Sequence, residues 1–451
     1  KTVQVIALLL ALKQDPEDSP SLIIAPASLL GNWRAELGRF APSLRLFTAH
    51  LSGCSREDLT AVECRPEQAL RGVDAVITTY QFVTSSNSFQ QHPWNVLVLD
   101  EAQAIKNPGT AQTRAVKKLQ ARTRIALTGT PVENRPGDLW SLFDFLNPGL
   151  LGSASAFAET LKRLGEPHGA GFAPLRKLVQ PYILRRMKTD RRIIKDLPDK
   201  TEVKARCPLT RKQATIYTRL VEELKRTLAD ETMEPAKRNG QVLGFLIKFK
   251  QVCNHPSHWS GDGQYRPEDS GKFLRIAEIG AELAERQERV IVFTQFAEIC
   301  EPLAHHLAQV FHRPGLVLHG GTPVARRAAL VEQFQAADGP PFFVISVKAG
   351  GTGLTLTAAS HVIHFDRWWN PAVENQATDR AYRIGQKKNV LVHKFVVPGT
   401  IEERIDRLIE EKKSVADDLL GSESGAEKML TQMNNDELLR FVSLDVTAVE
   451  G

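Results

Sequence analysis

Short apolar runs alternate with segments of helical spacing through the first third of the chain. The runs are "SLIIAP" (21–26), "DAVITTY" (74–80), "NVLVLDE" (95–101) and "TRIALTGTP" (123–131). Strands that are apolar on both faces and are separated by helices indicate a parallel sheet covered on both sides. We therefore predict an α/β unit over residues 1–150.

The pattern changes after "FDFLNPGLLG" (143–152), where the segments become helical and basic. The stretch "YILRRMKTDRRIIKDLPDK" (182–200) carries many cations, and residues 209–256 have the spacing of long helices. We predict helical insertions and an inter-lobe linker over residues 151–268.

Strand and helix patterns then alternate again, which predicts a second α/β unit over residues 269–420. From about residue 400 the chain has helical spacing and mixed charge, typical of a surface helix that packs on one face. A helical tail is expected over residues 421–451. The predicted fold class is α/β, with two parallel-sheet lobes and helical insertions between them. The apolar runs of the second unit are "RVIVFTQF" (289–296), "GLVLHGG" (315–321), "PFFVISV" (341–347), "HVIHFD" (361–366) and "VLVHKFV" (390–396).

Composition limits the environment and the partners of the chain. Lys and Arg outnumber Asp and Glu by 58 to 52, and this net charge of +6 permits a polyanionic partner without requiring one. The five cysteines form no C-x-x-C pair, so a reducing compartment is the simplest interpretation. The longest apolar stretch, Val5–Leu12, is far shorter than the ~20 residues of a membrane-spanning helix. Because the chain begins with Lys1 and not Met, we expect a fragment of a longer protein.

Two adjacent carboxylates, Asp100 and Glu101, directly follow the apolar run at Val96–Leu99. A strand of a doubly wound sheet delivers its last residues to the crevice where ligands bind. In nucleoside triphosphate hydrolysis an Asp there holds Mg²⁺, and a neighbouring carboxylate orients and deprotonates the attacking water. The alternative is that an acid at this place only caps the following helix.

Lys1 and Thr2 favour the catalytic alternative. A phosphate-binding loop ends in Gly-Lys-Ser/Thr at a helix start, where Lys meets the β and γ phosphates and the hydroxyl binds Mg²⁺. The sequence "KTVQVIALLLALK" is what should follow the glycines of such a loop. Lys-Thr is a common dipeptide, so its weight comes from preceding the Asp-Glu pair in one α/β unit. Thr2 and Asp100 are the predicted Mg²⁺ ligands.

The second unit supplies two arginines, Arg380 and Arg383, in "QATDRAYRIGQ" (376–386). Residues three apart project from one face of a helix, and two guanidinium groups on one face call for anions. The alternative is a basic surface helix. The preceding glycine-rich turn in "SVKAGGTGLTLTAASHVIHFD" (346–366) suits close approach of the backbone to a phosphate. A phosphate clamp formed across two domains is the simplest account.

Motifs along essentially the whole chain resemble, in order, those of the Swi/Snf ATPase family within helicase superfamily 2. The pairing of "DRWWNP" with "DRAYRIGQ" is the most specific of these resemblances. The resemblance implies two RecA-like lobes. The motifs are "KT" (1–2), "LIIAPASLLGNWRAEL" (22–37), "ITTY" (77–80), "LVLDEAQAIKN" (97–107), "ALTGTPVENRPGDLWSLFDFLNPG" (126–149), "ILRRMKTD" (183–190), "LPDK" (197–200), "KQVCNHP" (250–256), "VIVFTQF" (290–296), "LHGGT" (318–322), "VKAGGTGLTLTAASHVIHFDRWWNPAVENQATDRAYRIGQ" (347–386) and "TIEERI" (400–405).

The resemblance implies an ATP site with Mg²⁺ in the first lobe. Lys1 and Thr2 would bind the nucleotide phosphates and the metal, Asp100 would hold the metal, and Glu101 would activate water. Two groups would complete the site. They are the arginine fingers Arg380 and Arg383 from the second lobe, and the residues that line or couple the cleft, Gly129, Thr130, Gly351, Gly353 and Gln376.

The resemblance also implies tracking along one strand of duplex DNA through phosphate contacts from loops at the tops of both sheets. Phosphate contacts carry no sequence information, so binding should be nonspecific and strongly salt dependent. The same residues could instead be ordinary turns and solvated surface. The expected DNA contacts are Ser28, Lys106, Asn107, Thr322 and Lys348 to Gly350.

Two departures from the family pattern change the expectations. The glycines of the phosphate loop and the adenine-recognising segment before it are absent, so this chain should bind ATP poorly or not at all. Gln103 stands where many eukaryotic members have His, which resembles the bacterial or archaeal branch, and no bromodomain or chromodomain is visible. We expect a monomeric cytoplasmic, nucleoid-associated protein without a membrane partner that displaces or remodels DNA-bound protein.

Two rival functions stay open. One is a strand-separating helicase of the same superfamily, which needs a wedge between the strands that the sequence does not reveal. The other is a catalytically idle scaffold that binds DNA or a partner such as RNA polymerase. Retention of Asp100, Glu101, Arg380 and Arg383 weighs against the scaffold.

Two further groups of residues allow more than one interpretation. Cys253, His255 and His258 are close in sequence, but they lack a second ligand pair and "CNHP" resembles a structural helix end, so a metal site is disfavoured. Trp368 and Trp369 could stack on bases, as in proteins that bind single strands, or could pack a turn.

Overall fold

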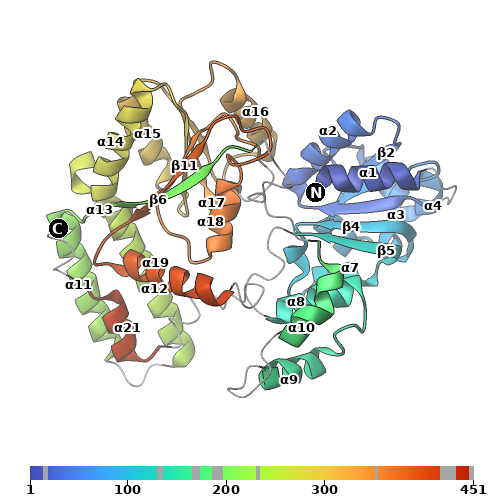
Figure 1. Ribbon diagram of the computed structural model, residues 1–451, viewed down its shortest axis with the longest axis horizontal. Coiled ribbons are helices and arrows are strands. Elements are labelled where there is room, and N and C mark those ends of the chain that lie inside the picture. Colours follow the sequence, from blue (N-terminus) through green and yellow to red (C-terminus); the bar gives the residue numbers. More distant parts are fainter. Residues whose placement is uncertain are drawn as a thin grey trace. The chain divides into compact units, whose positions relative to one another are not determined.

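The computed structural model describes residues 1–13, 19–128, 136–164, 173–184, 197–229, 234–350, 354–416 and 433–445. The chain forms two compact units, whose main parts are Lys1–Ile183 and Leu184–Val415 (Figure 1). Each unit contains one sheet whose paired strands all run parallel. The predicted α/β class with two parallel-sheet lobes is therefore confirmed.

The first unit contains a five-stranded sheet in the order β2-β3-β1-β4-β5. The four apolar runs predicted as strands are present, and β2 is an addition. This strand has only four residues at the sheet edge, two of them only partly buried, so it carries no long apolar run. The strands are β1 (Ser21–Ala25), β2 (Leu46–Ala49), β3 (Ala75–Thr79), β4 (Pro93–Asp100) and β5 (Gln120–Leu127).

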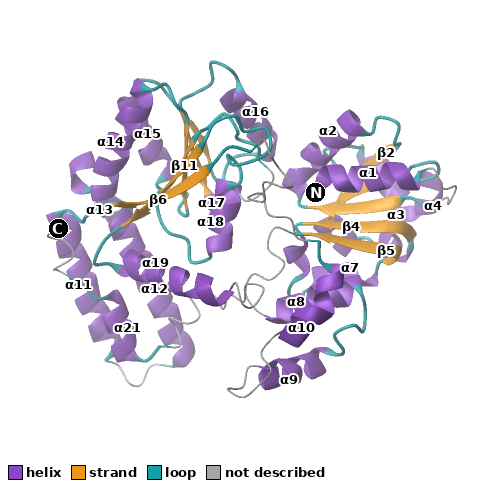
Figure 2. Cartoon of the chain, viewed as in Figure 1, coloured by secondary structure: helices purple, strands orange, loops and turns teal. Residues whose placement is uncertain are grey.

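Helices cover both faces of this sheet, as the apolar strands predict (Figure 2). On one face, Val5 and Leu9 of α1 and Trp33 of α2 pack against Ile23 and Val98. The opposite face packs against the helices that follow β3 and β4. The helices are α1 (Thr2–Leu12), α2 (Leu30–Phe40), α3 (Arg56–Cys64), α4 (Pro66–Ala69), α5 (Tyr80–Ser85), α6 (Asn87–Gln91), α7 (Ala111–Lys118), α8 (Pro136–Leu146), α9 (Ala154–Leu164) and α10 (Ala173–Val179), with 3₁₀ turns η1 (Ala27–Leu29), η2 (Ala102–Ile105) and η3 (Gln180–Tyr182).

The second unit contains a six-stranded sheet in the order β6-β11-β10-β7-β9-β8. The five predicted runs are strands, and β6 is an addition from a segment that we predicted to be linker. The sequence of β6, "KTEVKAR", is charged and mostly exposed at the sheet edge, which hides it from a search for apolar runs. The strands are β6 (Lys200–Arg206), β7 (Val290–Thr294), β8 (Leu316–Leu318), β9 (Phe342–Ser346), β10 (His361–His364) and β11 (Val390–Val396).

The long helices expected over 209–256 are present and share one hydrophobic core with the second sheet. Tyr217 and Phe249 pack in the same cluster as Phe273 and Phe365. The domain bounds expected at 150 and 268 stay a prediction. The helices are α11 (Arg211–Leu228), α12 (Pro235–Asn254), α13 (Pro256–Ser260), α14 (Gly271–Glu285), α15 (Cys300–Phe311), α16 (Val324–Gln335), α17 (Val347–Gly350), α18 (Pro371–Thr378), α19 (Ile401–Ala416) and α21 (Asn435–Val442), with the 3₁₀ turn η4 (Pro267–Asp269).

Within the described residues, no helix combines the length and the apolar character that crossing a membrane requires.

Candidate active site

The topology of the first sheet selects one place for a ligand. From β1 in the centre, the chain adds β2 and β3 on one side and then β4 and β5 on the other. In open parallel sheets, ligands bind outside the carboxyl ends of the strands where the strand order reverses. That point lies between β1 and β4, and β4 ends at Asp100.

Three hydrogen bonds fix Asp100 at this edge. The indole Nε1 of Trp33 donates to Oδ2 of Asp100 at 2.8 Å, and the amide of Glu101 donates to Oδ1 at 3.0 Å. The hydroxyl of Tyr80 donates to the backbone oxygen of Asp100 at 2.7 Å. Both carboxylate oxygens are thereby held by donors from the surrounding protein.

Glu101 follows in a left-handed backbone conformation, with φ 50° and ψ 53°. This region costs a residue with a side chain roughly 1–2 kcal/mol. Local contacts offset that cost, because the amide of Ala104 donates to the Glu101 carbonyl at 3.0 Å and Nε2 of Gln103 donates to Glu101 Oε2 at 2.6 Å. Oε1 of Gln103 in turn accepts from the Thr128 hydroxyl at 3.2 Å. Gln103 therefore links Glu101 to the end of β5.

The first residues of α1 lie at the same edge of the sheet as Asp100. At the opposite end of the helix, Nζ of Lys13 contacts Oδ2 of Asp74 at 3.0 Å, directly before β3 begins. The C-terminal end of α1 thus lies at the amino edge of the parallel strands. Since α1 packs along β1 and β4, its N-terminal residues Lys1 and Thr2 lie toward the carboxyl edge.

The oxygen atoms at this edge are suitable ligands for Mg²⁺. Magnesium prefers oxygen ligands and commonly takes one or two protein ligands together with substrate phosphates. The two hydrogen bonds to the Asp100 carboxylate occupy two of its roughly four acceptor sites. Among the described residues, no group of three or more His, Cys, Asp or Glu side chains forms a metal cluster. A site shared with phosphates does not require such a cluster.

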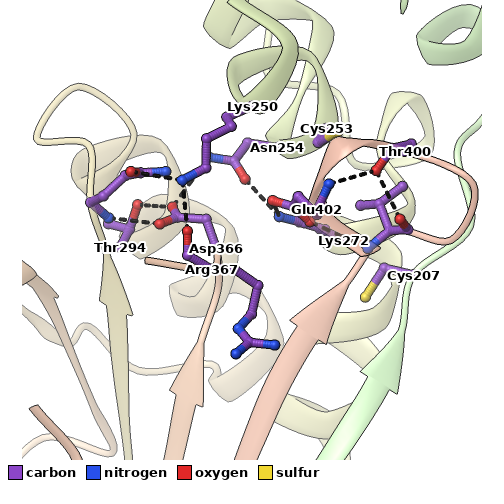
Figure 3. Close-up of polar contacts among 12 residues, drawn as sticks. Cys207, Lys250, Cys253, Asn254, Lys272, Thr294, Asp366, Arg367, Thr400 and Glu402 are labelled. Carbon is purple, nitrogen blue, oxygen red and sulfur yellow. Dashed lines mark hydrogen bonds and ion pairs between the residues drawn. The ribbon is translucent and has the colours of Figure 1, made fainter. Parts of the chain in front are cut away.

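The strand order of the second sheet reverses between β7 and β10. Asp366, just after β10, contacts Thr294 at the end of β7 (Figure 3). Oδ2 of Asp366 accepts from the Thr294 hydroxyl at 2.5 Å, and Oδ1 accepts from the amide of Gln295 at 2.9 Å. Nζ of Lys250, on α12, donates to Oε1 of Gln295 at 3.0 Å and to the carbonyl of Arg367 at 2.6 Å. Burial lowers the pKa of Lys250 to about 8, although nearby Asp366 favours its charged form.

Three further buried ion pairs hold the same region of the second unit. Lys272 of α14 contacts Oε1 of Glu402 on α19 at 2.6 Å. Arg367 contacts Glu374 of α18 at 2.9 Å and also pairs with Asp406 of α19. The segment between β10 and α18 is therefore tied by charge to the helices that cover the sheet.

The prediction that one helix carries both arginines is wrong, because the helix is shorter than expected. Helix α18 ends at Thr378, so Arg380 and Arg383 lie in the turns that follow. Tyr382 and its neighbours bury against the core there, and the carbonyl of Arg380 accepts from the amide of Leu356 at 2.9 Å, which turns the chain away from the helix axis. Arg380 is buried and Arg383 is partly exposed.

Other residues predicted from the sequence are distributed as follows. Gln376 is a partly exposed residue of α18. Trp368 and Trp369 are both partly buried against hydrophobic clusters, and Nζ of Lys250 lies 4.8 Å from the Trp369 ring centroid, which favours the packing interpretation. Gly129, Thr130, Gly351 and Gly353 lie outside the described residues.

The expected DNA contacts follow strands, which places each at the carboxyl edge of its own sheet. In the first unit, Ser28 lies in η1 after β1, with its side chain outside the description, and Lys106 and Asn107 follow η2 after β4. In the second unit, Thr322 follows β8, while exposed Lys348 and then Gly350 lie in α17 after β9. Two of these side chains hold their own loops. Oδ1 of Asn107 accepts from the amide of Gly109 at 3.0 Å, and the Thr322 hydroxyl accepts from the amide of His319 at 3.1 Å.

His255 serves a helix end. Its Nδ1 accepts from the amide of Ser257 at 3.0 Å, which caps α13, and its Nε2 lies 2.8 Å from the carbonyl of Arg266. Cys253 and His258 are buried beside it, and burial lowers the pKa of His258 to about 3.

Comparison with known proteins assigns the family. The model of the SNF2-related domain matches residues 1–258, and that of the helicase conserved C-terminal domain matches residues 271–385. The chain belongs to the SNF2-related family. This SNF2-related chain is 38% identical, over 99% of its length and 48% of the relative, to the putative ATP-dependent helicase/translocase YwqA of Bacillus subtilis. It is 32% identical to the human SWI/SNF-related matrix-associated actin-dependent regulator of chromatin subfamily A member 1, over 100% of this chain and 43% of that protein.

A solved structure is similar as well. The Sulfolobus solfataricus SWI2/SNF2 ATPase core in complex with dsDNA has 38% sequence identity and a TM-score of 0.49, with 99% of this chain and 91% of that chain covered. The SNF2-related chain spans less than half the length of the curated relatives that it matches, 48% for the Bacillus protein and 43% for the human one. The resemblance of the sequence motifs to the Swi/Snf ATPases is confirmed by the two family models and by these relatives.

Sequence reasoning missed the residues that hold Asp100. Trp33 and Tyr80 both lie in motifs that carried the resemblance, "LIIAPASLLGNWRAEL" and "ITTY", but no role was expected for either. The available signal was a buried aromatic residue with a polar group in a motif next to a ligand-binding edge. The O–H of a buried Tyr and the N–H of a buried Trp usually find a hydrogen-bond partner.

Proposed function

We propose that this chain is the motor of an ATP-dependent double-stranded-DNA translocase of the Swi/Snf type. It moves along duplex DNA without separating the strands, and it displaces or remodels bound protein. The observation that carries the proposal is the Asp100–Glu101 pair, held by hydrogen bonds at the switch point of a parallel sheet in a chain of the SNF2-related family. The naming of the Bacillus subtilis relative as a putative ATP-dependent helicase/translocase supports it.

In the proposed reaction, the first unit holds ATP. The ammonium group of Lys1 would meet the phosphates, and the Thr2 hydroxyl and the Asp100 carboxylate would hold Mg²⁺. Bound Mg²⁺ would neutralise charge on the phosphate oxygens. The Glu101 carboxylate, oriented through its contact with Gln103, accepts a proton from the attacking water.

The second unit is proposed to supply Arg380 and Arg383 as arginine fingers, a contribution typically worth ~10³–10⁵ in rate. Delivery of the fingers requires closure of the cleft, which couples hydrolysis to motion of the lobes. Five residues would line the cleft or transmit this motion. They are Gly129, Thr130, Gly351, Gly353 and Gln376.

The proposed track is the phosphate backbone of a DNA duplex. Exposed Lys348 lies in α17 directly after β9, and partly exposed Lys106 follows η2 after β4, so both cations are at strand ends where they can meet phosphates. Binding should be independent of sequence and should weaken steeply with salt. The further proposed contacts are Ser28, Asn107, Thr322 and Gly350.

We propose that the motor acts as a monomer on proteins bound to DNA in a prokaryotic nucleoid, with RNA polymerase among the candidate partners. A forked-duplex assay separates this function from that of a strand-separating helicase, because a translocase leaves the fork paired while it hydrolyses ATP. A scaffold would hydrolyse no ATP under any of these conditions.

The first experiment measures ATP hydrolysis by the chain with a glycine-rich phosphate loop joined in front of Lys1. Rates are compared without nucleic acid, with single-stranded DNA and with duplex DNA. We expect strong stimulation by the duplex and its loss in the Glu101→Gln variant, since an amide cannot accept the proton of water. A rate that ignores DNA would refute the translocase and favour an ATP switch or a scaffold.

A further inference from the structure

We propose that Trp33 and Tyr80 are positioning residues that fix the direction in which Asp100 presents its carboxylate to Mg²⁺. This inference rests on the proposed function, and it assigns to two aromatic side chains a task in the reaction that goes beyond packing. Neither residue would touch ATP or the metal. Both would act through Asp100.

The contact made by Trp33 has the properties of a fixed support. The side chain is 1% exposed, packed in the cluster that joins α1 and α2 to one face of the sheet. Its indole Nε1 is a donor only, cannot titrate and points at Oδ2 of Asp100 from 2.8 Å. A buried ring cannot change rotamer without disturbing its neighbours, so the direction of this hydrogen bond is set by the core.

Tyr80 holds the same residue through its backbone. The Tyr80 hydroxyl, at the start of α5, donates to the carbonyl of Asp100 at 2.7 Å. Asp100 is the last residue of β4 and precedes Glu101, which has a left-handed backbone conformation with φ 50°.

The two donors come from different elements and constrain different parts of Asp100. Trp33 fixes one carboxylate oxygen, Tyr80 fixes the peptide plane, and the amide of Glu101 fixes the other oxygen at 3.0 Å. Partners that orient a metal ligand in this way typically matter 10–100-fold for metal affinity or activity. A loss of about tenfold is therefore the expected effect of removing the Trp33 donor.

A purely structural role for Trp33 can be separated from a positioning role, because the first unit contains a matched control. Trp94 is 2% exposed, and its Nε1 donates to the carbonyl of Phe89 at 3.2 Å, at the opposite end of β4 from Asp100. Trp33→Phe and Trp94→Phe remove the same atoms from two buried sites. Only the first removes a donor to Asp100.

The experiment uses the chain with the phosphate loop joined in front of Lys1. Electron paramagnetic resonance measures binding of Mn²⁺, as a substitute for Mg²⁺, in the presence of ADP. We expect Trp33→Phe to weaken Mn²⁺ binding about tenfold, Tyr80→Phe to act in the same direction, and Trp94→Phe to leave binding unchanged. In ATP hydrolysis, Trp33→Phe should raise the Mg²⁺ concentration needed for the half-maximal rate, and excess Mg²⁺ should restore kcat.

Each outcome decides something. If Trp33→Phe and Trp94→Phe bind Mn²⁺ equally well while the parent hydrolyses ATP, the positioning role is wrong and the proposed function survives. If the parent neither binds Mn²⁺ with ADP nor hydrolyses ATP, both fall. Should Trp33→Phe fail to fold, the benzothienyl analogue of tryptophan, in which sulfur replaces the indole N–H, removes the donor with almost no change of shape and carries the same expectation.

Discussion

Lys272 and Glu402 form an ion pair whose two side chains are fully buried, with Nζ and Oε1 2.6 Å apart. Nζ of Lys272 also donates to Oδ1 of Asn254 at 2.8 Å. Removing one partner of such a pair leaves the other charge buried without compensation. We expect Lys272→Met to lower the free energy of unfolding of the chain by about 3–5 kcal/mol in urea denaturation.

The control is a pair of the same type at the surface. Nζ of Lys212 lies 2.6 Å from Oδ2 of Asp269, but the Lys212 side chain is 53% exposed. Lys212→Met should change the free energy of unfolding by only about 0–1 kcal/mol. Equal losses in the two variants would show that burial of the Lys272 pair does not govern its contribution.

At the same scale, the sequence identified the acids of the site but not their supports. Asp100 and Glu101 stand out because they interrupt an apolar run at its end. The contacts that hold Asp100 join residues 67 and 20 positions apart, Trp33 and Tyr80. No periodicity reports such pairs, because they exist only once α2 and α5 have packed on the sheet.

Among the helices, α12 and α14 each contain a glycine whose replacement has an opposite expected effect. A Cβ at Gly244, an exposed position of α12, meets nothing within 4 Å, whereas one at Gly271, which begins α14, would lie 1.9 Å from the carbonyl oxygen of Pro208. Gly244→Ala should raise the free energy of unfolding by about 0.5–1 kcal/mol because alanine loses less backbone entropy. Gly271→Ala should lower it by about 1–3 kcal/mol or more.

Thermal unfolding by calorimetry checks both glycine variants under one set of conditions. A decrease for Gly244→Ala would mean that the exposed face of α12 is covered by something that tolerates no methyl group. An unchanged free energy of unfolding in Gly271→Ala would mean that α14 shifts away from Pro208 without loss of stability.

Strands with consecutive apolar residues were predictable from the sequence, including the edge strands β5 and β8. Central strands such as β1 and β9 are continuous apolar runs and were found, whereas the edge strands β2 and β6 were not. Helix α18 was expected to continue through Arg383 but ends at Thr378, because burial of Tyr382 overrides the helical spacing of the charges. Tertiary packing, which spacing does not encode, decided these cases.

Over the whole molecule, acid should destabilise the second unit through its buried histidines. Burial lowers the pKa of His258 to about 3 and those of His364 and His393 to about 4, from an ordinary value of 6.5. The unfolded chain therefore binds protons below pH 6.5 that the folded chain does not. The contribution of these histidines to the free energy of unfolding is fully present above pH 6.5. It falls as the pH drops toward 4, by about 1.4 kcal/mol per pH unit for each such histidine.

Urea denaturation at pH 7.5, 6 and 5 measures this loss. His364→Gln removes one of these titrating groups, so the free energy of unfolding of this variant should depend less steeply on pH. The Glu202 carboxyl does not interfere, because contacts with Lys200 and Lys394 hold its pKa at about 2 despite the opposing effect of burial, so its own contribution is lost only at lower pH. Equal unfolding free energies at pH 7.5 and 5 would contradict the assignment of these histidines as neutral.

The presence of two parallel-sheet units was predictable because each repeats the same alternation of apolar runs and helices. The membership of β6 in the second sheet was not, since its partner β11 lies far along the chain. Long-range pairing of a charged edge strand leaves no local trace in the sequence.

That pairing has a consequence for the order of events during synthesis. Asp199, beside β6, bonds to Asn389, beside β11, across 190 positions of the chain. At the usual ~5–20 residues per second of translation, β6 would leave the ribosome roughly 10–40 s before its partner exists. The charges of "KTEVKAR" suit such an interval, because a charged edge resists pairing with the wrong strand. β6 is the first strand of the second sheet to be synthesised, but its pairing with β11 would be the last step in forming that sheet.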